Sequence, residues 1–321
     1  MAHWIHTPME EARPENLLGD RSPSLSGWTR ATVAGPLATS SRIWTVGSLV
    51  ALSALVLLLY ARVLGPLAAQ WWSDPNYGHG FLVPVFAACV LWREHRRWSE
   101  VPICASNWGI AILFFALGLL LLGKLGSEHF TERISLLFLI AGIVVFLAGW
   151  SALRRAAFPL GYLAFMVPLP AILYYQLTFP LQLLASRLGA DGLVALGVPT
   201  VREGNLLILP NCTLEVVEAC SGVRSLLSLL AAVVAYVYLF EPSLWKRCFL
   251  IAAVVPVVIA SNALRLVAAG ALSYRYGPGV DSGVAHTALG LVCFVAGLLA
   301  ILLLHRLLGR RSPAESSAGA H

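Results

Sequence analysis

Cys248–Leu272 reads CFLIAAVVPVVIASNALRLVAAGAL, an apolar run in which Arg265 is the single charged residue. About 20 mainly apolar residues are enough to cross the hydrocarbon core of a bilayer as a helix. The run therefore predicts a transmembrane helix. An arginine inside such a helix is costly and seldom idle, so Arg265 is a first candidate for a functional residue.

The composition extends this prediction to the whole chain. It is 58% hydrophobic and 12% charged, with a mean hydropathy of +0.78, well outside the range of soluble globular proteins. We predict an all-α polytopic membrane protein with about eight transmembrane helices. The predicted spans are Trp44–Leu64, Gly80–Trp92, Trp108–Leu122, Ile134–Trp150, Phe158–Tyr175, Ser221–Phe240, Cys248–Leu272 and Val284–Leu304.

Basic residues in the connections predict the orientation. Each even-numbered span is followed by a basic group: Arg93, Arg96 and Arg97, then Arg154 and Arg155, then Lys246 and Arg247, then Arg306, Arg310 and Arg311. Basic residues are retained on the cytoplasmic side, so both termini are expected there. The same bias accounts for the net charge of +6 without a nucleic-acid partner.

Three regions are expected along the chain. Residues 1–43 lack the apolar core and cleavage site of a secretory signal and are expected to form a disordered cytoplasmic tail. Residues 44–308 are expected to form an eight-span membrane domain, which would hold any catalytic site, and residues 309–321 a second cytoplasmic tail. No connection is long enough for a soluble catalytic domain, so any chemistry takes place at the membrane.

The longest outer connection precedes span six and changes character along its length. Phe179–Leu196 has the pattern of an amphipathic helix. Three short extended segments follow, Thr200–Arg202, Leu206–Leu209 and Thr213–Val217, and predict a small extracytoplasmic β-meander. This meander leads the chain to Cys220. It is expected to be either a lid at the interface or a docking edge for an extended peptide.

Cys220, Arg265 and His286 lie on three different spans, and topology places all three at the outer face. Arg265 is about 17 residues beyond the cytoplasmic start of its span, or roughly 25 Å along a helix. Cys220 is placed at the start of span six, where the helix dipole favours a thiolate. A thiolate can attack a carbonyl, an imidazole can exchange the proton and a guanidinium can hold the oxyanion. Asn262 shares a helix face with Arg265 and could orient it.

Each residue also has a structural interpretation. Cys220 could form a disulfide with Cys212, Arg265 could reach lipid headgroups, and His286 could be a hydrogen-bonded interfacial residue. Two rival functions remain: a transporter or flippase, and a scaffold in envelope polysaccharide export. No paired-Cys or His-Glu-x-x-His spacing and no phosphate or dinucleotide fingerprint occurs, so neither a metal nor a cofactor is expected.

Four motifs together carry a resemblance to a known family. They are NYGHGFLVP at residues 76–84, EACSGVRSL at 218–226, NALR at 262–265 and HTALG at 286–290. In this order and spacing they resemble the exosortase/archaeosortase family, whose pattern extends from about Asp74 to the end of span eight. The resemblance implies a bacterial inner-membrane cysteine transpeptidase with its active site facing the periplasm.

The resemblance also implies a substrate and site roles. The substrate would be an exported protein with a C-terminal sorting signal of PEP-CTERM type: a short motif, an apolar helix and a basic tail. The resemblance makes Cys220 the nucleophile, Arg265 the transition-state partner and His286 the acid/base. It adds His79 and Tyr77 as substrate contacts, although Tyr77 could equally be an interfacial anchor. Arg224 would meet an acidic signal residue, a helix cap or a headgroup. The thioester would pass to an amine on an envelope glycan or lipid, or to water.

Overall fold

The computed structural model describes residues 37–95, 102–216, 222–277 and 284–310. Two compact units make up the chain, Met1–Val56 and Leu57–His321. The described part of the first unit belongs to α1 (Leu37–Ser73), which begins seven residues before the predicted first span and extends into the second unit. The other described helices are η1 (Gly78–Phe81), α2 (Leu82–Arg93), α4 (Trp108–Leu125), α5 (His129–Ala148), α6 (Trp150–Tyr162), η2 (Leu163–Met166), α7 (Ala171–Ala195), α8 (Val223–Phe240), α9 (Leu244–Tyr276) and α10 (Val284–Arg310).

Six helices in the described ranges are long and apolar enough to cross a membrane. Their apolar segments are Val50–Ser73, Trp108–Leu125, His129–Ala148, Val223–Phe240, Leu244–Tyr276 and Ala288–Gly309. A bent pair of helices, α6–η2 and α7, raises the number of crossings to seven if it counts as one span, and Gly78–Arg93 is a shorter apolar helix. The mainly helical membrane fold is therefore confirmed, and the count of eight spans is not.

The predicted fifth span, Phe158–Tyr175, is wrong as a continuous helix. The chain is helical to Met166, irregular from Val167 to Pro170, and helical again from Ala171, with a 75° bend between the two parts. Pro168 and Pro170 explain the break, because proline cannot donate an intrahelical hydrogen bond and disfavours helical backbone in the residue before it. The predicted amphipathic helix Phe179–Leu196 is consequently the second part of α7.

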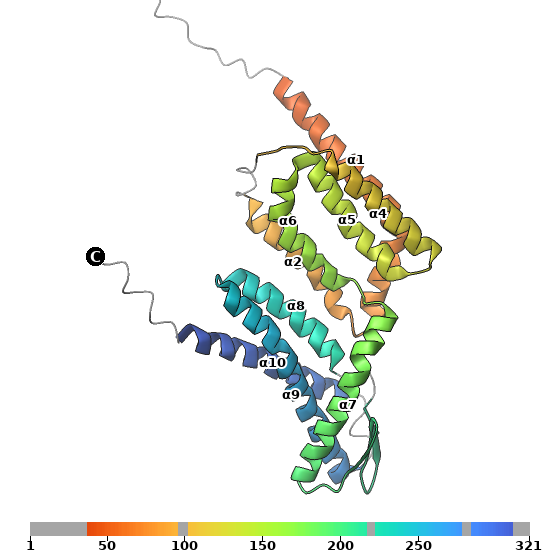
Figure 1. Cartoon of the computed structure of the whole chain (residues 1–321), viewed down its shortest axis with the longest axis vertical. Helices are drawn as coiled ribbons and strands as arrows, with labels where there is room; N and C mark the ends of the chain where they lie inside the picture. Colours follow the sequence, from red (N-terminus) through yellow and green to blue (C-terminus); the bar gives the residue numbers. More distant parts are fainter. Residues whose placement is uncertain (1–36, 96–101, 217–221, 278–283, 311–321) are drawn as a thin grey trace, which may run out of the picture. The chain divides into compact units, whose positions relative to one another are not determined.

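Helices α8, α9 and α10 pack around one apolar core. Its largest fully buried members are Leu229, Val233, Leu250, Val254 and Ile301. Helix α9 contacts both α8 and α10, and Figure 1 shows its later part running beside α7. Because α9 contacts both others, it joins α8 and α10 in one core.

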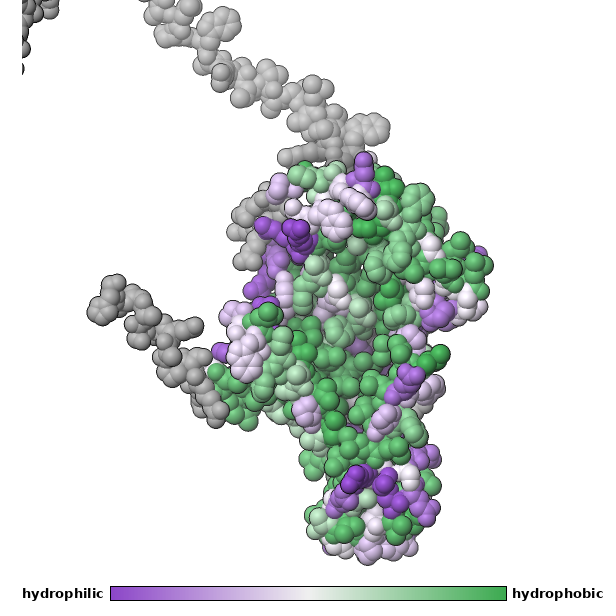
Figure 2. All heavy atoms as spheres, in the orientation of Figure 1, coloured by the Kyte–Doolittle hydropathy of each residue, from purple (hydrophilic) through white to green (hydrophobic). Residues whose placement is uncertain are grey.

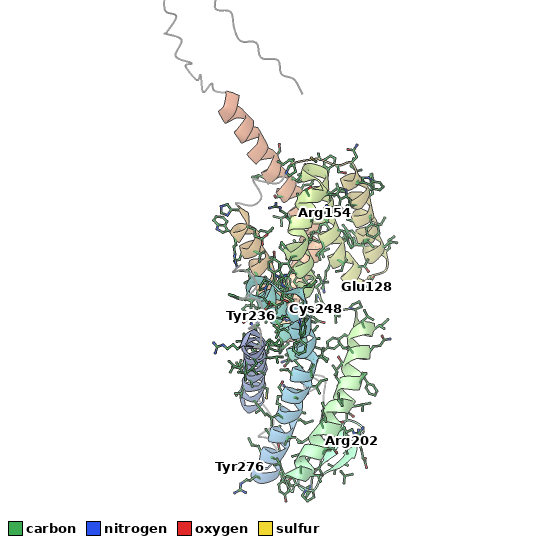
Figure 3. The ribbon with its side chains drawn as sticks, turned by 60° about the vertical axis from the view of Figure 1, so that its left-hand side comes forward. Glu128, Arg154, Arg202, Tyr236, Cys248 and Tyr276 are labelled. Carbon is green, nitrogen blue, oxygen red and sulfur yellow. The ribbon has the colours of Figure 1, made fainter. Side chains whose placement is uncertain are left out.

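The predicted three-stranded meander is confirmed. It consists of β1 (Val201–Glu203), β2 (Leu206–Ile208) and β3 (Thr213–Glu215) in antiparallel order. Gly204 has a positive φ of 63° at the first position of the two-residue turn between β1 and β2, a place that favours glycine. Figure 3 shows Arg202 on β1 and Tyr276 at the end of α9 at the same end of the molecule's second unit.

The meander packs against α7 and α9. Leu193, Leu207, Val216 and Leu266 are buried in a second apolar cluster that joins these three elements. Asn211 Nδ2 donates to the backbone oxygens of Ser273 and Tyr274 on α9, at 3.2 and 2.8 Å. The sheet is therefore fixed to the helix that carries Arg265.

Helices α4 and α5 approach each other closely at Gly109. A Cβ at this position would lie 2.5 Å from Phe146 Cα, so only glycine allows the observed distance between the two backbones.

Large apolar side chains such as Phe114 and Leu122 are exposed on α4. Figure 2 shows apolar residues over most of the visible face, which is the surface expected for helices in contact with lipid tails.

Candidate functional site

A cavity of about 310 Å³ lies where the start of α8, the second half of α9 and the early turns of α10 meet the loop that follows α1. Two of its lining residues are arginines that the sequence singled out. The lining residues are Pro75, Arg224, Ser225, Ser228, Arg265, Gly290, Leu291 and Phe294. We call this space the arginine cavity.

Arg265 projects from α9 toward α10 at this cavity. A Cβ on Gly290 would lie 3.5 Å from Arg265 Nη1, so the guanidinium rests against the backbone of α10. The backbone of His286 lies in the first turn of α10, one helical turn before Gly290, and its side chain lies outside what the structure describes. Residues four apart on a helix share a face, so position 286 is on the face of α10 that meets Arg265.

Gly222 brings the start of α8 onto the same part of α9. It has a φ of 86°, and a Cβ there would lie 3.2 Å from Asn262 Cγ. Asn262 is buried, with 5% of its surface exposed. Cys220 precedes Gly222 by two residues and lies outside the described residues, as does its proposed pairing with Cys212.

Arg224 is held from the loop that follows α1. Its Nε donates to Asn76 Oδ1 at 3.1 Å, and the Asn76 backbone N–H donates to Asp74 Oδ1 at 2.9 Å. The first of these bonds joins residues 148 positions apart in the sequence. It orients one guanidinium at the edge of the arginine cavity.

His79 lies between the arginine cavity and a second, more apolar one. His79 Nδ1 and Ser228 Oγ are hydrogen-bonded at 3.2 Å, and Ser228 lines the arginine cavity. His79 itself lines a cavity of about 260 Å³ with Tyr77, Phe165, Leu169, Leu227 and others. Burial lowers the pKa of His79 below its ordinary value, partly offset by a backbone hydrogen bond at Phe165. His79 is therefore neutral near pH 7.

Tyr77 forms part of the wall of this apolar cavity and is buried. Burial is the main cause that raises its pKa to about 12, so the phenol stays protonated at physiological pH. The irregular segment between η2 and α7 supplies Val167 and Leu169 to the same wall. The proline break thus has a structural consequence: it lines a cavity with non-helical backbone, which membrane proteins tolerate at such places.

Comparison of the sequence with models of protein families gave a match. The model of the transmembrane exosortase family (Exosortase_EpsH) matches residues 71–303. The chain belongs to the transmembrane exosortase family. Neither the comparison with curated proteins nor the comparison with solved structures gave a match. The resemblance seen in the four sequence motifs is thereby confirmed, and the chain is a multi-pass membrane protein.

All candidate site residues of this exosortase lie within the matched region. The structure brings Arg224, Arg265 and the backbone of Gly290 to one cavity, with Asn262 behind the start of α8. His79 and Tyr77 lie at the neighbouring apolar cavity instead.

Sequence reasoning did not single out Asn76, Ser225 or Ser228 as site residues. Ser228 follows Arg224 at i+4, and Ser225 lies beside it, so the three form a short polar stripe on a helix that is otherwise apolar. That stripe was a detectable signal. The pairing of Asn76 with Arg224 had none, because nothing local in the sequence links residues so far apart.

Proposed function

We propose that this exosortase is a membrane cysteine transpeptidase or peptidase. Its substrates would be exported proteins with a C-terminal sorting signal of PEP-CTERM type, cleaved at the outer face of the bacterial inner membrane. Eight crossings with both termini in the cytoplasm belong to this proposal. The amine acceptor would be a group on an envelope glycan or lipid, and with water the same enzyme would act as a protease.

The observation that carries the proposal is the convergence at the arginine cavity. Arg265 and the His286-bearing face of α10 meet there. Gly222, which follows Cys220 by two residues in the sequence, packs on Asn262 of α9. The meeting of α8, α9 and α10 at this cavity supports the proposal that the Cys220 thiol, the Arg265 guanidinium and the His286 imidazole act together.

The proposed reaction has two halves, formation of a thioester and its resolution. Cys220 gives its proton to His286, and the thiolate attacks the scissile carbonyl carbon. Arg265 stabilises the oxyanion of the tetrahedral intermediate. His286 returns the proton to the leaving amine as the C–N bond breaks, which leaves a thioester on Cys220. An acceptor amine or water then attacks the thioester carbonyl carbon and gives a proton to His286. The C–S bond breaks, and His286 returns the proton to the Cys220 sulfur.

The substrate contacts follow from the two cavities. Arg224 and Arg265 give the arginine cavity a positive charge that suits an acidic residue near the scissile bond. The cavity lined by Tyr77 and His79 suits an apolar side chain next to it. Asn262, behind the start of α8, would orient the segment that carries the nucleophile.

Co-expression with a tail-anchored substrate tests the proposal. The substrate is recovered and its mass is measured for the native chain and for Cys220→Ser. Loss of processing is expected for Cys220→Ser at unchanged amounts of enzyme in the membrane. Cys248→Ser is the matched control, since Cys248 is exposed near the start of α9, at the end away from Arg265.

The same experiment separates the rival functions. A transporter or a scaffold would not need the Cys220 thiol, so its cellular function would survive Cys220→Ser. Normal processing by the Cys220→Ser variant would rule out the proposed chemistry.

A further inference from the structure

A second polar cavity of about 310 Å³ lies among the ends of α2, α8 and α9. Its lining residues are Val90, Arg93, Glu94, Tyr238, Leu239 and Arg247. Arg247 precedes Arg265 by 18 residues on α9, which is roughly 27 Å along a helix and close to the thickness of the hydrocarbon core. This cavity, which we call the headgroup cavity, is therefore at the opposite membrane interface from the arginine cavity.

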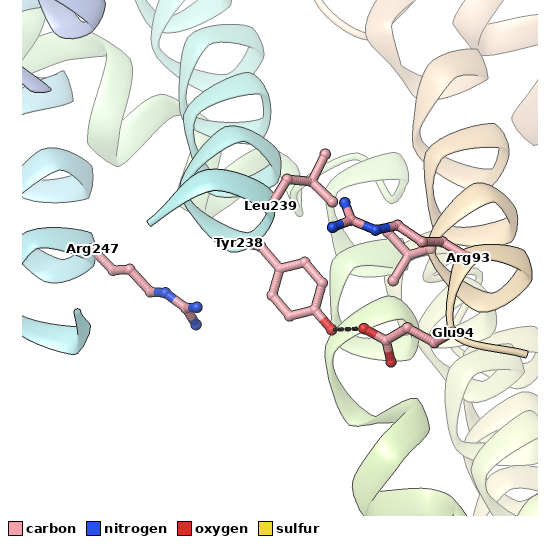
Figure 4. A pocket seen from close by; sticks show the side chains of 6 residues that line it. Arg93, Glu94, Tyr238, Leu239 and Arg247 are labelled. Atoms are coloured by element: carbon pink, nitrogen blue, oxygen red, sulfur yellow. Dashed lines mark hydrogen bonds between the residues drawn. The ribbon is translucent and has the colours of Figure 1, made fainter. Parts of the chain in front are cut away.

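Several side chains of the headgroup cavity are held in place by contacts with one another and with Phe158. Tyr238 stacks on Phe158 with ring centroids 3.4 Å apart and donates its hydroxyl proton to Glu94 Oε1 at 2.9 Å. Arg247 lies over the Tyr238 ring, with Cζ 5.9 Å from its centroid. Figure 4 shows Arg93 and Glu94 reaching from α2 toward Tyr238, and Arg247 pointing toward it from α9.

The charges in this cavity do not cancel. Arg247 Nε donates to the backbone oxygen of Glu241, while the carboxylate of Glu241 is occupied by the Ser243 backbone N–H and by His305. In the ranges that the structure covers, no carboxylate pairs with Arg93. Two guanidinium groups therefore face a single carboxylate, that of Glu94, so the lining attracts a phosphate and repels a basic peptide.

The position of the cavity indicates that the phosphate belongs to a lipid headgroup. Trp92, next to Arg93, and Trp245, two residues before Arg247, are both exposed. Exposed tryptophans at helix ends mark the depth of the lipid headgroups. Val90 and Leu239 add apolar side chains to the lining.

We propose that the headgroup cavity binds the headgroup of an amine-bearing phospholipid such as phosphatidylethanolamine. The phosphate lies between Arg93 and Arg247, and the ammonium group lies at the carboxylate of Glu94. The lipid thereby joins α2 to α8 and α9, which are otherwise connected here by the bond between Tyr238 and Glu94. This site does not depend on the proposed peptidase activity.

The test uses the full chain in nanodiscs of phosphatidylcholine alone, or with added phosphatidylethanolamine or phosphatidylglycerol. Thermal unfolding midpoints and lipids retained in native mass spectrometry are measured. Phosphatidylethanolamine is expected to give the larger stabilisation. Arg93→Gln and Arg247→Gln should each weaken its retention roughly tenfold or more, as expected for loss of a charge-assisted contact. Arg154→Gln, at an exposed arginine on α6 outside the cavity, should bind like the native chain.

Glu94→Gln tests the contact with the ammonium group separately from the contacts with the phosphate. It should abolish the preference for phosphatidylethanolamine over phosphatidylglycerol while phosphate-dependent retention persists. An unchanged preference in Glu94→Gln, or unchanged retention in Arg93→Gln, would overturn the proposal. If Arg93→Gln proves unstable, Arg93→Lys takes its place. This milder change keeps the charge and should give intermediate retention.

Soluble probes distinguish a lipid from a free anion. Phosphoethanolamine and inorganic phosphate are added at constant ionic strength to the chain in phosphatidylcholine nanodiscs. Stabilisation by phosphoethanolamine well above that by inorganic phosphate supports the proposal. Equal stabilisation by inorganic phosphate and by phosphoethanolamine would instead show a simple anion site and contradict it.

Discussion

Arg265 places a charge inside an apolar helix, which costs free energy, and its side chain has a defined neighbour. It belongs to an apolar helix and rests against the backbone of α10 at Gly290. A guanidinium is planar and offers several fixed donors, whereas an ammonium is a single point of charge. At the residue scale, the proposed oxyanion role therefore depends on the shape of the side chain as well as on its charge.

Arg265→Lys should lower the rate of substrate processing by roughly 10²- to 10³-fold, because it removes donors from the developing oxyanion. Arg275→Lys, an exposed arginine near the end of the same helix, should leave the rate almost unchanged. Processing rates are measured by quantitative immunoblotting of the co-expressed substrate. Equal rates for both variants would remove Arg265 from the chemistry.

His79 should make stability depend on pH. Burial holds its pKa below the ordinary value of 6.5, so the unfolded chain binds this proton more readily than the folded chain. The contribution is fully present above pH 6.5 and is lost as the pH falls toward the folded pKa. The difference in thermal midpoint between pH 7.5 and 5.5 should therefore shrink in His79→Gln.

His95→Gln provides the comparison for this pH effect, because His95 is exposed. It should retain the pH dependence of the native chain. A native-like pH dependence in His79→Gln would show that His79 is not held neutral by burial.

At the scale of elements, the long apolar runs were sufficient to predict most helices. α4, α8, α9 and α10 lie where the predicted spans lie, because lipid-exposed and buried faces of a membrane helix are both apolar. The same property hid the break at Val167–Pro170. Pro168 and Pro170 were visible signals, but the run around them stayed apolar, and the apolar length was given more weight than the backbone chemistry of proline.

The interface between α4 and α5 depends on the absence of a side chain at one residue. Gly109→Ala should lower the free energy of unfolding by about 1–3 kcal/mol, because its Cβ would overlap the backbone at Phe146 and backbone cannot move aside as a side chain can. Gly118→Ala on the same helix meets nothing within 4 Å and should change stability by less than about 1 kcal/mol. Thermal unfolding in nanodiscs compares the two variants, and equal midpoints would contradict the packing.

At the scale of the whole molecule, the membrane depth of each residue, counted along its span, was the basis for predicting the site. Counting residues along spans placed Arg265 and His286 at one face, and the structure brings Arg265 to the face of α10 that carries position 286. Contacts between distant loops and helices were not predictable in this way. The pairs Arg224–Asn76 and His79–Ser228 depend on how the loop after α1 packs on α8, which no local pattern encodes.

The proposed topology makes a separate prediction. A reporter fused after His321 should behave as cytoplasmic, because basic residues follow every even-numbered span. Glu203→Cys, exposed at the end of β1, should react with a membrane-impermeant maleimide added from the periplasm. A periplasmic signal from the fusion, or protection of the cysteine at position 203, would reverse the assignment of faces.

The covalent intermediate is the most direct test of the account. Enzyme and tail-anchored substrate are mixed and denatured rapidly, and the peptide that contains Cys220 is mapped by mass spectrometry. We predict that this peptide carries the N-terminal part of the substrate as a thioester, sensitive to neutral hydroxylamine and absent from Cys220→Ser. Processed substrate with no such adduct on Cys220, or with an adduct on another residue, would contradict it.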